Sequence, residues 1–120
     1  MILQKFSYII PADRSGILNT MIFQLYKGSF IKNAYIGDFV KISTKSVAST
    51  HLNLKKSKHK AIIVRTRKET LKKDGSWIKF FLNEGVLLKK RTTPLGSEVC
   101  GPTLYSLRRR KFLKSFSGVL

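Results

Sequence analysis

The sequence predicts an all-β protein, a small β-barrel with a short helical appendage at its C-terminal end. Through residues 1–90, short apolar runs recur with turn residues between them, which is typical of five or six short strands. Several of these runs alternate apolar and polar residues with a period of two. After Gly101-Pro102 this alternation stops. A length of 120 residues fits one domain, which we expect to span residues 1–120.

The first two strands are predicted at residues 1–10 and 17–27. The first is a short apolar run, and the loop at residues 12–16 follows it because Asp, Ser and Gly are concentrated there. In the second run the odd positions are mostly apolar, as at Ile17, Met21 and Phe23. We therefore expect the odd face of this strand to point into the core.

A third strand is predicted at residues 38–47, after a turn at residues 35–38. Its even positions, Val40, Ile42 and Thr44, form the expected core face. Lys41 and Lys45 lie on the opposite face. One strand can thus serve the core and present positive charge to the surface.

The centre of the chain combines an apolar strand with a hairpin signal. Residues 61–64 form a mostly β-branched run that is too short for a helix. Asp74-Gly75 is a hairpin turn signal, so residues 77–82 are expected to return beside the strand at residues 60–68. The lysine-rich residues 48–60 suggest an extended loop or ribbon, and residues 84–90 a further strand.

Beyond a loop at residues 91–96, the C-terminal part is predicted to be helical at about residues 103–118. Leu104 and Leu107 fall at helical spacing, Thr103 can cap the helix, and Pro102 blocks its extension backwards. The basic cluster at residues 108–111 would lie near the helix end, where cations favour the helix dipole.

The charge of the chain indicates a polyanionic partner. There are 24 Lys and Arg residues against 6 Asp and Glu, a formal net charge of +18. A free domain of that charge repels itself, which favours nucleic acid as the native environment over a soluble basic protein without a partner. A membrane surface fits less well because the charge is spread along the chain, and no run of about 18 apolar residues exists.

The residue types that carry catalysis or bind metals are scarce. Cys100 is the single cysteine, so no internal disulfide or CxxC metal pair is expected, and it is predicted to be a small buried or semi-buried hydrophobe. His51 and His59 lack a metal-ligand spacing. The six acidic residues are scattered and no P-loop, GxSxG or HExxH motif occurs. We expect no enzyme activity, metal or cofactor.

Nucleic-acid binding by phosphate contact is the interpretation that the pattern favours. Lysines alternate with apolar residues, and arginines can contact phosphates through two hydrogen bonds. Aromatic residues are few on the predicted basic faces, so recognition of folded RNA by shape and backbone fits better than base stacking. The predicted contacts are Lys41, Lys45, Lys55, Lys56, Lys58, Lys60, Arg65, Arg67, Lys68, Arg108, Arg109, Arg110 and Lys111.

Two alternatives remain open. The first is a free barrel that binds single-stranded nucleic acid, whose mark would be stacking aromatics on the basic face. The second is a small basic enzyme such as a nuclease, which would need a paired acid and base that the spacing does not reveal.

Several spaced motifs together carry a resemblance. The residues Ala-Ile-Ile-Val at 61–64 are followed at fixed intervals of nine, four, two and two residues by Asp74-Gly75, Phe80, Asn83 and Val86-Leu87. This order and spacing resembles the signature of the universal large-subunit ribosomal protein family numbered fourteen. The loop at residues 12–16 is similar to the family's Ala-Asp-Asn-Ser-Gly loop, with Arg14 replacing the Asn and adding a phosphate contact.

The resemblance implies a closed five-stranded barrel with a β-ribbon and small C-terminal helices. It implies a non-catalytic structural constituent of the large ribosomal subunit on its intersubunit face. The implied partners are large-subunit rRNA, small-subunit rRNA across a bridge, and neighbouring proteins including the one numbered nineteen. A ribosome-silencing factor is a further implied partner. Its docking surface in the family has a Thr-Arg pair and a Lys, matched here by Ser97, Glu98 and Lys114, so that Glu98 reverses the usual charge.

The composition also bears on location. The richness in Phe, Ile and Lys resembles products of AT-rich organellar genomes. We therefore expect a mitochondrial ribosome in the mitochondrial matrix, with a plastid or the bacterial cytoplasm as the alternatives.

Overall fold

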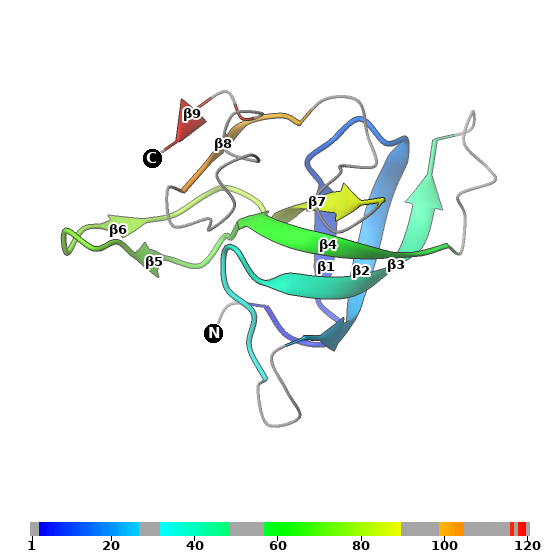
Figure 1. Cartoon of the computed structure of the whole chain (residues 1–120), viewed down its shortest axis with the longest axis horizontal. Coiled ribbons are helices and arrows are strands. Elements are labelled where there is room, and N and C mark those ends of the chain that lie inside the picture. Colours follow the sequence, from blue (N-terminus) through cyan, green and yellow to red (C-terminus); the bar gives the residue numbers. More distant parts are fainter. Residues whose placement is uncertain are drawn as a thin grey trace.

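Five strands close into a barrel in the computed structural model, which describes residues 3–26, 32–48, 57–89, 99–104, 116 and 118–119 (Figure 1). Around the barrel the strands follow the order β1-β2-β3-β4-β7. β1 and β7 run parallel and close it, and the other neighbours are antiparallel. The predicted all-β barrel is thus confirmed. Its strands are β1 (Tyr8–Pro11), β2 (Ile17–Leu25), β3 (Phe39–Val47), β4 (Lys58–Arg65) and β7 (Glu84–Leu88).

A two-stranded ribbon, β5 (Thr70–Leu71) and β6 (Trp77–Ile78), extends away from the barrel between β4 and β7 (Figure 1). The predicted hairpin turn at Asp74-Gly75 is confirmed, because Gly75 has a φ of +88° and its N–H donates to the carbonyl of Lys72 at 3.1 Å. The expected return of residues 77–82 beside β4 is wrong. β4 pairs with the apolar β7 instead, and β6 ends at Ile78.

The barrel interior is filled by apolar side chains that alternate along the strands. The predicted core face of β3 is confirmed, since Val40, Ile42 and Thr44 are buried. The turn before it is also confirmed, because Asp38 N–H donates to the Tyr35 carbonyl. The members of this inner cluster are Leu3, Ile9, Ile17, Ile22, Ala34, Val40, Ile42, Ala61, Ile63 and Leu87.

The face of β2 that points inward differs from the prediction. Beyond Ile17, the fully buried residues are Thr20 and Ile22, which are even positions, whereas Met21 and Phe23 are only half-buried. The pairing with β3 is irregular between Ile17 and Thr20, where the register shifts twice, so one unbroken alternation does not run through this part of β2. The buried Thr20 hydroxyl donates to the Ile9 carbonyl at 2.9 Å, so its polar group is satisfied.

A second apolar cluster lies outside the barrel, over β4 and β7. Its members alternate with residues of the inner cluster, as Ile62 and Val64 do with Ala61 and Ile63. β4 therefore buries both faces, which explains why its sequence is a continuous apolar run. The outer cluster contains Ala12, Ile62, Val64, Val86, Leu88 and Phe116, with Phe39 and Val99 packed against it.

Two described residues of the C-terminal segment, Val99 and Phe116, pack in this outer cluster, and two short strands of the segment pair with each other. β8 (Pro102–Thr103) runs parallel to β9 (Gly118–Val119). The expectation that Thr103 caps a helix is wrong, because its hydroxyl donates to the Val64 carbonyl at 3.2 Å and holds the segment on β4. The predicted helical residues between 105 and 115, and the loop at 91–96, lie outside the described residues.

The position of Cys100 differs from the prediction. Cys100 is exposed, so its prediction as a buried or semi-buried hydrophobe is wrong. Its backbone N–H, not its side chain, joins the segment to the barrel by donating to the Ala12 carbonyl at 2.7 Å.

Within the part of the chain that the structure describes, no helix has the length and apolar character to cross a membrane.

Candidate nucleic-acid interface

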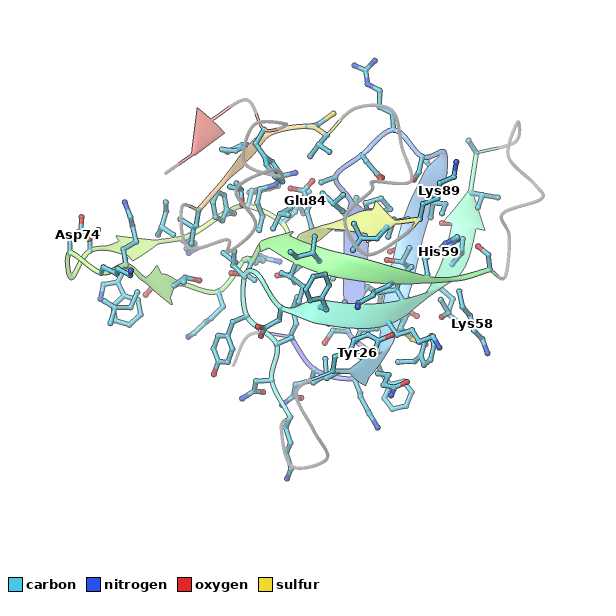
Figure 2. The ribbon with its side chains drawn as sticks, in the orientation of Figure 1. Tyr26, Lys58, His59, Asp74, Glu84 and Lys89 are labelled. Atoms are coloured by element: carbon cyan, nitrogen blue, oxygen red, sulfur yellow. The ribbon has the colours of Figure 1, made fainter. Side chains whose placement is uncertain are left out.

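The outer side of β2, β3 and the start of β4 carries a different set of side chains from the apolar cluster over β4 and β7. Three lysines and three aromatic residues gather there, in contrast to the apolar cluster over β7. Figure 2 shows two of them, Tyr26 and Lys58, on the same side of the barrel. We call this surface the lysine face; it consists of Phe23, Tyr26, Phe39, Lys41, Lys58 and Lys60.

Strand register brings like charges together on the lysine face. Lys41 of β3 lies directly opposite Lys60 of β4. Lys58 precedes Lys60 by two residues on β4 and lies opposite Ser43. Side chains at directly opposite positions have Cβ atoms about 5 Å apart, where like charges destabilise the sheet. None of the three lysines forms an ion pair with a described residue. The face is therefore positively charged, with no ion-paired counter-charge among the described residues.

The aromatic rings hold the lysine ammonium groups in place. The Nζ atoms of Lys41 and Lys58 lie 5.9 and 5.7 Å from the centre of the Phe23 ring. Lys60 Nζ lies 5.0 Å from the Tyr26 ring and 4.5 Å from the Phe39 ring. Such cation–π contacts are worth about 0.5–1 kcal/mol at exposed sites and compensate part of the repulsion.

The prediction that few aromatic residues lie on the basic surface is wrong, because three aromatic rings contact the lysines of this face. The predicted core position of Phe23 is wrong, because Thr20 and Ile22 face the core and the alternation then turns Phe23 outward, where Lys41 lies over its ring. Because lysine ammonium groups already lie over the rings, these rings are not an open platform for single-stranded bases.

Arg65 does not belong to the basic surface, in contrast to its predicted phosphate contact. The residue is 5% exposed and forms an ion pair with Glu84 of β7 through Nε. Its Nη1 donates to the Pro102 carbonyl at 2.8 Å. Because this guanidinium is committed to partners within the chain, we assign Arg65 a structural role and omit it from the interface.

The other predicted contacts are distributed over the molecule. Arg67 and Lys68 are exposed where β4 leads into the ribbon, while Arg14 is exposed in the loop after β1 and Lys45 near the end of β3. The structure thus brings together Lys41, Lys58 and Lys60 but not these four. The predicted residues Lys55, Lys56, Ser97, Glu98, Arg108, Arg109, Arg110, Lys111 and Lys114 lie outside the described residues.

A short chain of polar side chains joins β3 to the start of β4, on the opposite strand face from Lys58 and Lys60. The Thr44 and Ser57 hydroxyls are 3.0 Å apart, and Ser57 Oγ lies 2.8 Å from His59 Nε2. Burial lowers the pKa of His59, and the negative charge of Asp13 opposes that shift to a lesser extent. Folding therefore favours the neutral form of His59. No group of three or more His, Cys, Asp or Glu residues gathers as a metal site in the described ranges.

Comparison with known proteins agrees with this architecture. Residues 1–118 match the family described as ribosomal protein L14p/L23e. The chain belongs to this family. It is 46% identical over 116 residues to the large ribosomal subunit protein uL14m of Tetrahymena pyriformis, an alignment that covers 97% of this chain and 98% of the relative. Membership makes the chain a structural component of the large ribosomal subunit and not an enzyme.

The residues that carried the family resemblance have structural roles in this ribosomal protein. Residues 61–64 are the buried centre of β4, and Gly75 occupies a positive-φ turn position. Asn83 joins two elements, because its side-chain oxygen accepts the Arg67 N–H at 2.8 Å and its carbonyl accepts the Ile10 N–H at 3.0 Å. The signature thus describes how the barrel closes, and the lysine face lies mainly outside it.

Proposed function

We propose that this ribosomal protein binds large-subunit rRNA through the lysine face. The observation that carries the proposal is the Lys41–Lys60 pair, two cations placed opposite each other without a described acidic partner. In the free protein this arrangement costs stability, whereas RNA phosphates would neutralise both charges at once.

The geometry suits the backbone of folded RNA. The aromatic rings support the lysine stems, so less side-chain freedom is lost when phosphate binds. Because the three ammonium groups come from adjacent strands, they form a compact patch rather than a flexible tail. Such a patch recognises the position of phosphates and carries little base specificity. Arg14, Lys45, Arg67 and Lys68 are proposed as further phosphate contacts outside the patch.

The ribosome in question is the mitochondrial one. The relative's name, uL14m, denotes a mitochondrial large-subunit protein, and the near full-length match supports the same location for this chain. In the assembled subunit the partners are rRNA and other ribosomal proteins.

The family resemblance supports four finer proposals about contacts within the ribosome. They are a contact with the protein numbered nineteen, a bridge to small-subunit rRNA, docking of a silencing factor, and rRNA contacts through Lys55, Lys56, Arg108, Arg109, Arg110 and Lys111. Silencing-factor docking would involve Ser97, Glu98 and Lys114, with the reversed charge at Glu98 weakening it. An exposed apolar surface offers a site for a neighbouring protein. It consists of Phe81, Leu82 and Ile10, whose side chains are all exposed. The Ile10 N–H donates to the carbonyl of Asn83, the residue after Leu82, which brings Ile10 near the other two.

Sedimentation of the tagged chain from mitochondrial lysate tests the assignment to the ribosome. The chain should co-migrate with the large subunit at low magnesium, when the two subunits separate. Migration with the small subunit, or only as free protein, would contradict the assignment.

Salt dependence of RNA binding tests the lysine face itself. The double variant Lys41→Gln/Lys60→Gln should reduce the slope of log K against log salt by about 1.4–1.8, since each phosphate contact contributes about 0.7–0.9. The matched control Lys5→Gln/Lys32→Gln removes the same charge from exposed positions elsewhere and should change the slope less. Equal slopes for the two variants would show that the face is not a specific contact site.

A further inference from the structure

We propose that Trp77, at the outer face of the ribbon, stacks on an unpaired base of the bound RNA. The proposal rests on the proposed RNA-binding function and adds a second, chemically different contact to it. Trp77 is 63% exposed and lies directly opposite Leu71, which is 57% exposed. An indole of that exposure has a large planar surface in water that the fold of this chain does not use.

The two faces of the ribbon differ in burial. Thr70 and Ile78 form the other cross-strand pair, and both are half-buried. Thr70 points toward the barrel, since its hydroxyl lies 3.4 Å from that of Thr66. Trp77 and Leu71, being the adjacent residues on each strand, therefore face away from the barrel. This outer face is available to a partner that covers the barrel.

The charge around the indole matches a nucleic acid. Residues 67–80 contain five basic residues, Arg67, Lys68, Lys72, Lys73 and Lys79, against the two acids Glu69 and Asp74. Asp74 is used by the turn, because its Oδ1 accepts both the N–H and the hydroxyl of Ser76 at 3.0 and 2.6 Å. An apolar protein partner would meet a surface rich in lysine, a residue depleted from protein interfaces. A base stacked on the indole would instead place its own phosphates near these cations.

The ribbon is attached firmly enough to position the ring. At its base, Phe80 N–H donates to the Thr66 carbonyl at 3.1 Å and Arg67 N–H donates to Asn83 Oδ1 at 2.8 Å. At its tip, Lys72 N–H donates to the Ser76 carbonyl at 2.8 Å. In Figure 2 the labelled Asp74 marks this tip, well away from the barrel. The ring is thus presented on a structured arm and not on a loose loop.

Trp77 also differs from the aromatic residues of the lysine face. Those rings have ammonium groups over them, whereas no cation of the described residues lies over the Trp77 ring. The indole therefore has open faces for a base. The ribbon would bind an extruded nucleotide while the lysine face binds the duplex backbone.

Tryptophan fluorescence tests this contact directly, because Trp77 is the single tryptophan of the chain. The full chain is titrated with an RNA hairpin that carries a two-adenine bulge, and in parallel with the same hairpin fully paired. The bulged RNA should quench the emission and protect the indole from acrylamide, and the paired RNA should do so much less. Trp77→Ala should bind the bulged hairpin about 5- to 100-fold more weakly, while Trp77→Phe retains most of the affinity.

The matched control is Phe81→Ala, which removes another aromatic ring, 86% exposed, that lies outside the ribbon strands. It should leave the affinity for bulged RNA unchanged. Equal quenching by both hairpins, or unchanged binding by Trp77→Ala, would overturn the proposal. So would a Trp77→Ala variant that loses a co-purifying ribosomal protein but keeps its affinity for the bulge. In each of these outcomes the paired hairpin should still bind in a salt-dependent way. Loss of that binding would contradict RNA binding through the lysine face, which is a different result from the failure of Trp77 stacking.

Discussion

Replacing Arg65 with Ala separates a structural arginine from a phosphate-binding one. Its side chain is 6% exposed, and it pairs with Glu84, whose side chain is 21% exposed. Removing one partner of a buried ion pair costs about 3–5 kcal/mol because the other charge is left without compensation. Since Glu84 retains some contact with water, we expect a loss of about 2–4 kcal/mol in the free energy of unfolding. That is a large part of a typical stability of about 5–15 kcal/mol.

Urea denaturation followed by far-ultraviolet circular dichroism measures this loss. The matched control is Arg67→Ala, two residues along the chain and exposed. Arg67→Ala should change stability by less than about 0.5 kcal/mol, yet lower the salt slope of RNA binding by about 0.7–0.9. Arg65→Ala, measured where it is still folded, should leave that slope unchanged.

The opposite pattern would show that Arg65 binds RNA and does not stabilise the fold. If Arg65→Ala kept its unfolding midpoint and lost one phosphate contact from the salt slope, the arginine would serve RNA and the pair with Glu84 would be incidental. A third variant, Glu84→Gln, checks the pair from its other side and should also destabilise the fold.

Two further changes test the local chemistry. Gly101→Ala should lower the free energy of unfolding by about 1–3 kcal/mol, because Gly101 has a φ of +82° and a Cβ would lie 2.6 Å from Arg65 Nη1. In urea denaturation, the double variant with Arg65→Ala should lose less stability than the sum of the two single variants. His59 has a lowered pKa in the folded chain, so the unfolded chain binds more protons below about pH 6.5 and stability should fall as pH drops through that value. His59→Gln should flatten this dependence between pH 7 and the folded-state pKa, and an unchanged slope would show that other groups cause it.

The barrel could be predicted where one period runs through a whole strand. β3 keeps its alternation from Val40 to Thr44, so its core face followed from the sequence. β4 was recognisable as a strand because residues 61–64 are apolar and largely β-branched. The strand that pairs with β4 could not be predicted, because Trp77–Ile78 and Glu84–Leu88 both follow the turn at Asp74-Gly75. Tertiary packing determines that β7 is the partner.

The candidate site was harder to predict because the pairing of β2 with β3 is irregular. The register shifts at three places between Ile17 and Gln24, and the residue pattern carries no clear mark of these shifts. The burial of Arg65 likewise depends on Glu84 and on Pro102, which lie 19 and 37 residues further along the chain. Arg65 thus connects β4 to β7 and β8, although its place in a basic stretch of the sequence is typical of an exposed residue.

Acetylation of lysines in the intact mitochondrial large subunit tests the central claim most directly. Purified subunits and the free chain are labelled briefly, and the modified lysines are located by mass spectrometry. We expect Lys41, Lys58 and Lys60 to be protected in the subunit, and nuclease digestion of the rRNA to restore their reactivity. Equal labelling of these three lysines in the free chain and in the subunit would show that RNA does not cover the lysine face, and would contradict the account.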